Sequence, residues 1–229
     1  MKFIDVDIDL HDCNKIGLRI SGGADSAILL QLLCETIIAE NPKAYIQPLT
    51  INLDIKPWNP YYVHQVLDYT KEKYPDIDIK PLIEVPCTEK TYTSTQAWIE
   101  SCDEYKGLFE IVFGGVTANP LKSDIDDWGI DGKGMSIWEH RDKNRDQDVV
   151  KEIFTQHDIK RNYIKSCFPF ANIDKKKIAE LYDLLKVRQT LFPLTRSCEA
   201  ISEDCEQFTI QCGKCWWCKE RIYGFGSLE

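Results

Sequence analysis

Apolar residues recur along the first two thirds of the chain in two alternating patterns. Short apolar runs of strand length occupy residues 15–20, 45–52, 78–85 and 110–113. Longer segments of helical length lie between them, at residues 25–40, 59–73 and 93–105. Strands that alternate with helices predict a three-layer α/β fold of Rossmann-like type, built on a parallel sheet.

Several local signals set the bounds of these elements. The helix over 25–40 is apolar on most of its faces, which predicts a buried rather than an amphipathic helix. Asn59 and Pro60 are a favourable start for the next helix. Pro81 lies inside the strand predicted over 78–85, so that strand is either at a sheet edge or broken.

The pattern changes after residue 115. Residues 116–148 are rich in Asp, Gly and Trp and show neither a helical nor a strand period, which favours a functional or mobile loop. Asp174 then caps a predicted helix, and a cysteine-rich segment follows Pro193. We therefore expect an α/β domain over residues 1–190 and a small C-terminal region of helical or knuckle type over residues 191–229.

The segment between the first strand and the first helix is a candidate phosphate-binding turn. Its glycines let the backbone approach an anion closely, and a helix N-terminus supplies free amides. The serines at both ends add hydroxyl donors. Neither the usual P-loop pattern nor the dinucleotide fingerprint occurs in the chain. The predicted binding residues are Ile20, Ser21, Gly22, Gly23, Ala24, Asp25 and Ser26.

Composition and charge narrow the functional classes. The 229 residues carry a net charge of −9, which argues against a large nucleic-acid footprint. The sequence has no apolar run long enough for a membrane helix and no signal-peptide pattern at its start, so we expect a cytoplasmic protein. In a reducing compartment, its ten cysteines favour metal or catalytic roles over disulfides.

Five of the ten cysteines crowd into the last 32 residues. Cys212, Cys215 and Cys218 form a Cys-x-x-Cys-x-x-Cys run, which is typical of a structural zinc site that takes a fourth cysteine from elsewhere. Cys198 and Cys205 are the nearest candidates. Iron–sulfur clusters use similar runs, and a redox pair would leave the third and fourth thiols unexplained.

Two resemblances bring these motifs together. Ser-Gly-Gly-x-Asp-Ser at residues 21–26 resembles the pyrophosphate loop of the N-type ATP pyrophosphatases, which have the adenine nucleotide alpha hydrolase-like fold. The segments 169–178, 194–198 and 212–221 resemble the C-terminal half of 7-cyano-7-deazaguanine synthase. The second resemblance extends from about residue 15 to residue 225 and implies that Cys198, Cys212, Cys215 and Cys218 bind one structural Zn²⁺.

The resemblance also implies an activity. The family uses ATP to adenylate a carboxylate, and ammonia then displaces AMP; the product of the family is 7-cyano-7-deazaguanine, a precursor in queuosine biosynthesis. The catalytic residues would be Ser26, through its hydroxyl, and Asp25, which would orient the loop or hold Mg²⁺ through water. The implied cofactors are ATP, Mg²⁺ and Zn²⁺.

Departures from the family keep other hypotheses open. The family carries a Tyr-Pro-Asp-Cys-Arg segment after its fourth strand, whereas this chain has a different sequence from Gly114 to Trp128. The substrate could therefore be another carboxylate, or a tRNA, although the acidic balance argues against nucleic acid. A non-catalytic zinc-ribbon binding module is the third hypothesis. We expect no membrane partner, and the sequence leaves a homodimer open.

Overall fold

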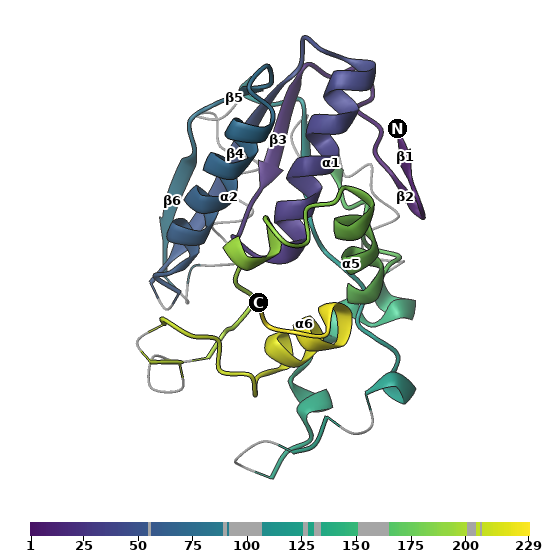
Figure 1. Cartoon of the computed structure of the whole chain (residues 1–229), viewed down its shortest axis with the longest axis vertical. Helices are drawn as coiled ribbons and strands as arrows, with labels where there is room; N and C mark the ends of the chain where they lie inside the picture. Colours follow the sequence, from purple (N-terminus) through teal and green to yellow (C-terminus); the bar gives the residue numbers. More distant parts are fainter. Residues whose placement is uncertain are drawn as a thin grey trace.

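A parallel six-stranded sheet forms the centre of the protein (Figure 1). The computed structural model describes residues 1–54, 56–88, 91, 107–125, 128–130, 134–150, 165–200, 205–206 and 208–229. Strand β4 pairs with β3 on one side and with both β5 and β6 on the other, while β3 continues through β7 to β8. The strands are β3 (Lys15–Arg19), β4 (Tyr45–Leu53), β5 (Asp78–Ile79), β6 (Ile83–Cys87), β7 (Ile111–Gly114) and β8 (Lys165–Cys167).

Three helices cover one face of this sheet: α1 (Ala24–Glu40), α2 (Asn59–Lys73) and α5 (Lys175–Leu184) (Figure 1). Alternation along the strands separates two cores. Ile111 and Phe113 of β7 face the large core beneath the helices, whereas Val112 packs in a smaller cluster with Leu49, Val85 and Phe109. The sheet is thus apolar on both faces, as expected of a parallel sheet.

The predicted elements of the first half are largely confirmed. Helix α1 buries residues on most of its faces, as its sequence indicates. The predicted strand over 78–85 is broken into β5 and β6, and Pro81 lies in the gap because proline cannot donate to a strand ladder. The helix predicted over 93–105 lies outside the described residues.

The structure also contains elements that the pattern does not predict. A short hairpin of β1 (Lys2–Phe3) and β2 (Val6–Asp7) precedes the sheet, and β8 adds its edge strand. The segment after β7 contains the short 3₁₀ turns η3 (Lys122–Asp124), η4 (Ile137–His140) and η5 (Lys143–Arg145). None of the described helices is both long enough and apolar enough to cross a membrane.

The C-terminal residues pack directly on the α/β elements. Turn η6 (Phe192–Leu194) and helix α6 (Trp216–Phe225) follow α5, and α6 lies against α5 (Figure 1). Arg221 of α6 is fully buried and donates hydrogen bonds to the carbonyl oxygens of Phe192, Thr195 and Leu228. The division of the chain near residue 190 remains a prediction.

Candidate functional site

A cavity of about 520 Å³ lies beyond the carboxyl ends of the strands. The order of the strands reverses at β3: β4, β5 and β6 lie on one side of it, and the later strands β7 and β8 lie on the other. Such a switch point opens a crevice at the carboxyl ends of a parallel sheet. The cavity walls come from the ends of β3, β4 and β7, the start of α1, and the C-terminal region. They include Ser21, Gly23, Asp25, Ser26, Thr50, Gly115, Thr117, Arg145, Lys175, Arg196, Cys198, Trp217 and Glu220.

The predicted phosphate-binding turn forms one wall of this cavity. Gly22 has φ +74°, in the left-handed region that glycine adopts without cost. A Cβ on Gly22 would lie 2.7 Å from the Cβ of Tyr62 and 3.1 Å from the backbone nitrogen of Val63. The turn therefore needs glycine at this position both for its conformation and for its packing on α2.

The Ser26 hydroxyl closes the turn on itself. The backbone N–H of Ser21 donates to Ser26 Oγ over 3.2 Å, and Ser26 Oγ donates to the carbonyl oxygen of Gly23 over 3.2 Å. Helix α1 begins at Ala24, so its first amides have no acceptor within the helix. Hydroxyls and amides are thus gathered where the helix dipole favours an anion.

The loop after β7 lies against the same turn. A Cβ on Gly115 would be 2.9 Å from the backbone nitrogen of Ser26, so only glycine allows the two backbones to approach this closely. Asn119, further along the loop, is buried and donates to the carbonyl oxygen of Asp142 and to the Asp146 carboxylate, each over 2.8 Å. These contacts join two parts of the loop, of which Thr117, Asp142 and Arg145 line the cavity.

Four charged side chains line the cavity wall beside the turn. Lys175 Nζ donates to both carboxylate oxygens of Asp25, over 2.7 and 2.6 Å, and lies 3.8 Å from Glu220 Oε2. Arg145 forms an ion pair with Glu220 and donates to the backbone oxygen and hydroxyl of Thr117, each over 2.7 Å. Negative and positive side chains alternate in the order Asp25, Lys175, Glu220 and Arg145, so each of these charges has a partner of opposite sign.

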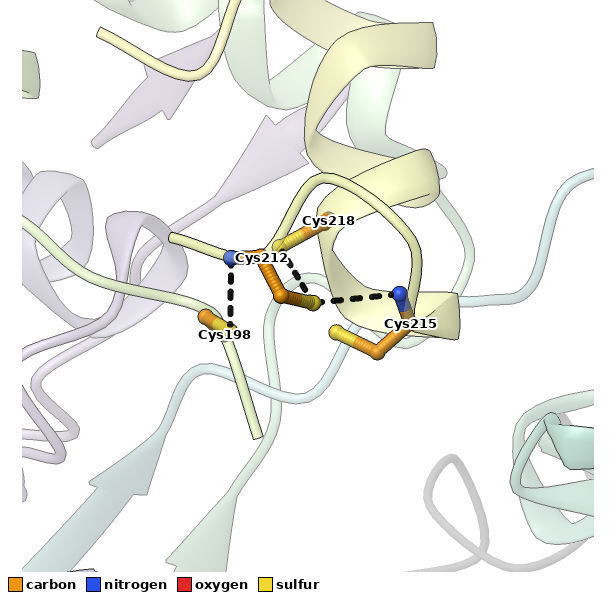
Figure 2. A group of neighbouring side chains, drawn as sticks. All are labelled: Cys198, Cys212, Cys215 and Cys218. Atoms are coloured by element: carbon orange, nitrogen blue, oxygen red, sulfur yellow. Dashed lines mark hydrogen bonds between the residues drawn. The ribbon is translucent and has the colours of Figure 1, made fainter. Parts of the chain in front are cut away.

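Four cysteine thiols lie together next to this wall (Figure 2). Cys198 comes from the segment after η6, Cys212 and Cys215 from the turn before α6, and Cys218 from α6 itself. All four sulfur atoms lie within 4.8 Å of one another.

Backbone amides point at these sulfurs. Cys212 Sγ accepts from the N–H of Lys214 over 3.4 Å and from that of Cys215 over 3.3 Å, and Cys198 Sγ accepts from the N–H of Cys212 over 3.3 Å. Hydrogen bonds from Cys215 and Cys218 lower the pKa of Cys198, whereas the bond to Cys198 raises the pKa of Cys215 to about 12. Amide donors of this kind stabilise thiolates, which are the form that binds a metal.

Cys205, the alternative fourth ligand, lies apart from this group. Its thiol is buried and lies 3.7 Å from the carbonyl oxygen of Ala200, and it is absent from the cluster of mutually close sulfurs among the described residues.

The sequence places the turn between β3 and α1 and brings out the four cysteines, but of the four charged side chains on the wall it singles out only Asp25. Lys175 and Glu220 lie inside the motifs that carry the family resemblance, although neither spacing nor composition gave them a role. Arg145 lies in a stretch without periodicity. A buried ion pair across 75 or 150 residues leaves no local pattern in the sequence.

The fold and the site together define a parallel α/β protein with a glycine-containing turn at the mouth of a cavity and a four-cysteine cluster. No protein-family model and no curated protein matches the sequence. Among solved structures, the chain is similar to the U34-tRNA thiolase NcsA from Methanococcus maripaludis, which was solved with its [4Fe-4S] cluster. The two share 15% sequence identity with a TM-score of 0.48; the match covers 80% of this chain and 61% of that one.

Proposed function

We propose that the protein is an ATP-dependent carbon–nitrogen ligase that binds the phosphates of ATP on the turn from Ser21 to Ser26. The observation that carries the proposal is the meeting of this turn, the Lys175 ammonium and the loop after β7 around one cavity. Amides and hydroxyls preorganised around an anion stabilise the negative charge that develops on departing pyrophosphate. Lys175 adds a cation on the same wall.

The contacts of Asp25 favour the first of its two predicted roles. Because both its oxygens accept hydrogen bonds from Lys175, the carboxylate orients the turn and holds the lysine in place. Mg²⁺ would then be held chiefly by the phosphates of ATP, which is its usual arrangement in such sites.

The reaction we propose begins with attack of a substrate carboxylate oxygen on the α-phosphorus of ATP. The bond to the β-phosphate breaks, pyrophosphate leaves, and an acyl adenylate forms. Ammonia then attacks the acyl carbon and AMP leaves, which gives an amide. For a nitrile product, the amide oxygen attacks the α-phosphorus of a second ATP and a second pyrophosphate leaves. Loss of AMP and of both protons from the amide nitrogen then completes the dehydration.

We assign Zn²⁺ to the four cysteines. Zn–S bonds of about 2.3 Å in a tetrahedron separate the sulfurs by roughly 3.8 Å, and Cys212 Sγ lies 3.9 Å from Cys218 Sγ. A [4Fe–4S] cluster would place each thiolate on a different iron atom, and a [2Fe–2S] cluster would divide the four thiolates between two irons. Either cluster holds its four sulfurs farther apart than a single ion does, whereas here all four lie within 4.8 Å of one another. With four thiolate ligands the ion has no open position, so its role is structural.

The substrate we propose is 7-carboxy-7-deazaguanine, with 7-cyano-7-deazaguanine as product. Support comes from the resemblance in segments 169–178, 194–198 and 212–221, all of which contribute to or adjoin the cavity. The loop from Gly114 onward differs from the family and also lines the cavity. Another carboxylate is the alternative substrate, because a buried polar site rejects analogues that leave its groups unpaired and the changed loop alters which groups must be paired.

The test is to supply 7-carboxy-7-deazaguanine, ammonia, ATP and Mg²⁺ and to follow AMP and the nitrile by mass spectrometry. Formation of AMP that depends on this acid supports the full assignment. Pyrophosphate exchange with another carboxylate alone would retain the ligase and discard the deazapurine. Failure to exchange with any carboxylate would discard the ligase.

A further inference from the structure

Helix α6 connects the cysteine cluster to the proposed ATP turn through buried charges. Glu220 lies two residues after Cys218 on the same helix and is only 1% exposed. Its carboxylate lies 3.8 Å from the ammonium of Lys175, which in turn holds Asp25 in the first turn of α1. A displacement of α6 would therefore change the position of the lysine beside the turn.

The backbone of α6 is also pressed against Lys175. A Cβ on Gly224 would lie 2.5 Å from both the Cγ and the carbonyl oxygen of Lys175. Interiors packed this closely have few alternative arrangements and transmit strain. Lys175 is 4% exposed, so its side chain has little freedom to take a new position independently of α6.

A second connection begins at Cys198. Two residues before it, the N–H of Arg196 donates to the carbonyl oxygen of Gly22 over 2.9 Å. Arg221 of α6 donates to the hydroxyl of Thr195 over 2.8 Å and so ties this segment to the helix. Cys198 and Cys218 therefore anchor two segments: one contacts the ATP turn directly through Arg196, and the other reaches it through Lys175.

We propose that Glu220 is a positioning residue that couples metal binding at the four cysteines to nucleotide binding at the turn. The metal fixes α6 and the segment at Cys198 relative to each other, and Glu220 and Arg196 carry that arrangement to Lys175 and Gly22. This inference rests on the proposed function, since it assumes that the turn binds nucleotide. Coupling of this kind is reciprocal: the nucleotide must tighten metal binding by the same factor.

The experiment compares the wild-type protein with Glu220→Gln, each loaded with zinc. Elemental analysis measures bound zinc, and calorimetry measures the affinity for a non-hydrolysable ATP analogue with Mg²⁺. We expect Glu220→Gln to keep its zinc and to bind the analogue about tenfold more weakly, a typical size for coupling between two sites. Chelator competition then measures zinc affinity with and without the analogue, which should tighten binding in the wild type and much less in the variant.

The matched control is Glu180→Gln, the same change at an exposed carboxylate on α5 that pairs only with Lys177 among the described residues. It should leave both affinities unchanged. If Glu220→Gln does not fold, the coupling is tested on the wild type alone, by its zinc affinity with and without the analogue. A zinc affinity that does not respond to the analogue would overturn the coupling. Normal analogue affinity and normal linkage in Glu220→Gln would overturn the role of this residue. If the zinc-loaded wild type fails to bind the analogue, the proposed function fails instead.

Discussion

Replacement of Gly22 by alanine should destabilise the protein strongly, whereas the same change at Gly23 should not. Gly22 has φ +74°, where an alanine costs about 1–2 kcal/mol. The new Cβ would also lie 2.7 Å from Tyr62 Cβ, 3.1 Å from the nitrogen of Val63 and 3.2 Å from the oxygen of Asn59. Two of these three neighbours are backbone atoms, which cannot rotate away, and such overpacking costs about 1–3 kcal/mol.

The sum for Gly22→Ala is a loss of about 2–5 kcal/mol in the free energy of unfolding. Gly23 has φ −82° and ψ 162°, which any residue adopts, and its nearest neighbours would be Ser21 Oγ at 3.4 Å and the Arg196 oxygen at 3.6 Å. Because these are ordinary contacts, Gly23→Ala should cost about 1 kcal/mol or less.

The free energy of unfolding of both variants is measured by urea titration of the zinc-loaded protein, with circular dichroism as the signal. With a slope of about 3 kcal/mol per molar urea, the midpoint of Gly22→Ala should fall by about 0.7–1.7 M at an unchanged slope. Equal midpoints for the two alanine variants would refute the reasoning, because they would mean that the turn does not need its left-handed glycine.

Two further variants test the metal and the turn. Cys215→Ser should lose zinc and stability while Cys205→Ser keeps about one equivalent of zinc per chain, as elemental analysis would show; the opposite result would reassign the fourth ligand. Ser26→Ala should lower turnover about 10- to 100-fold at a stability cost of about 1 kcal/mol, and normal turnover would remove this hydroxyl from the site. Asp25→Asn should lower turnover and also cost about 1–3 kcal/mol, because Lys175 loses the nearer of its two carboxylate partners; an unchanged melting temperature would argue against that pairing.

The sequence predicts elements well where the pattern is local. A helix that buries most of its faces, such as α1, has few polar positions, and its composition alone distinguishes it from a surface helix. The cysteines from 212 to 218 are equally local, because short Cys-x-x-Cys turns bring thiols together whatever the surrounding fold. The broken strand at Pro81 follows from the chemistry of a single residue.

Prediction fails where a residue's role depends on distant partners. β8 has only three residues and finds its place only through pairing with β7. Lys175 and Asp25 are 150 positions apart, and a charged residue at the start of a helix ordinarily faces solvent. Cys198 was placed through a family resemblance, since spacing alone left Cys205 as an equal candidate.

The buried charges on the cavity wall have a physical cost that stability alone does not explain. Asp25, Lys175, Glu220 and Arg145 must lose much of their hydration, and apolar residues of similar volume often stabilise a core as well as an ion-pair chain does. What apolar residues cannot supply is a fixed ammonium beside the turn that we propose binds phosphate. An ammonium held between two carboxylates has a fixed position before a ligand arrives, and a preorganised charge needs no rearrangement when a phosphate binds. The position of these four residues on the cavity wall therefore favours a role in binding over a role in stability.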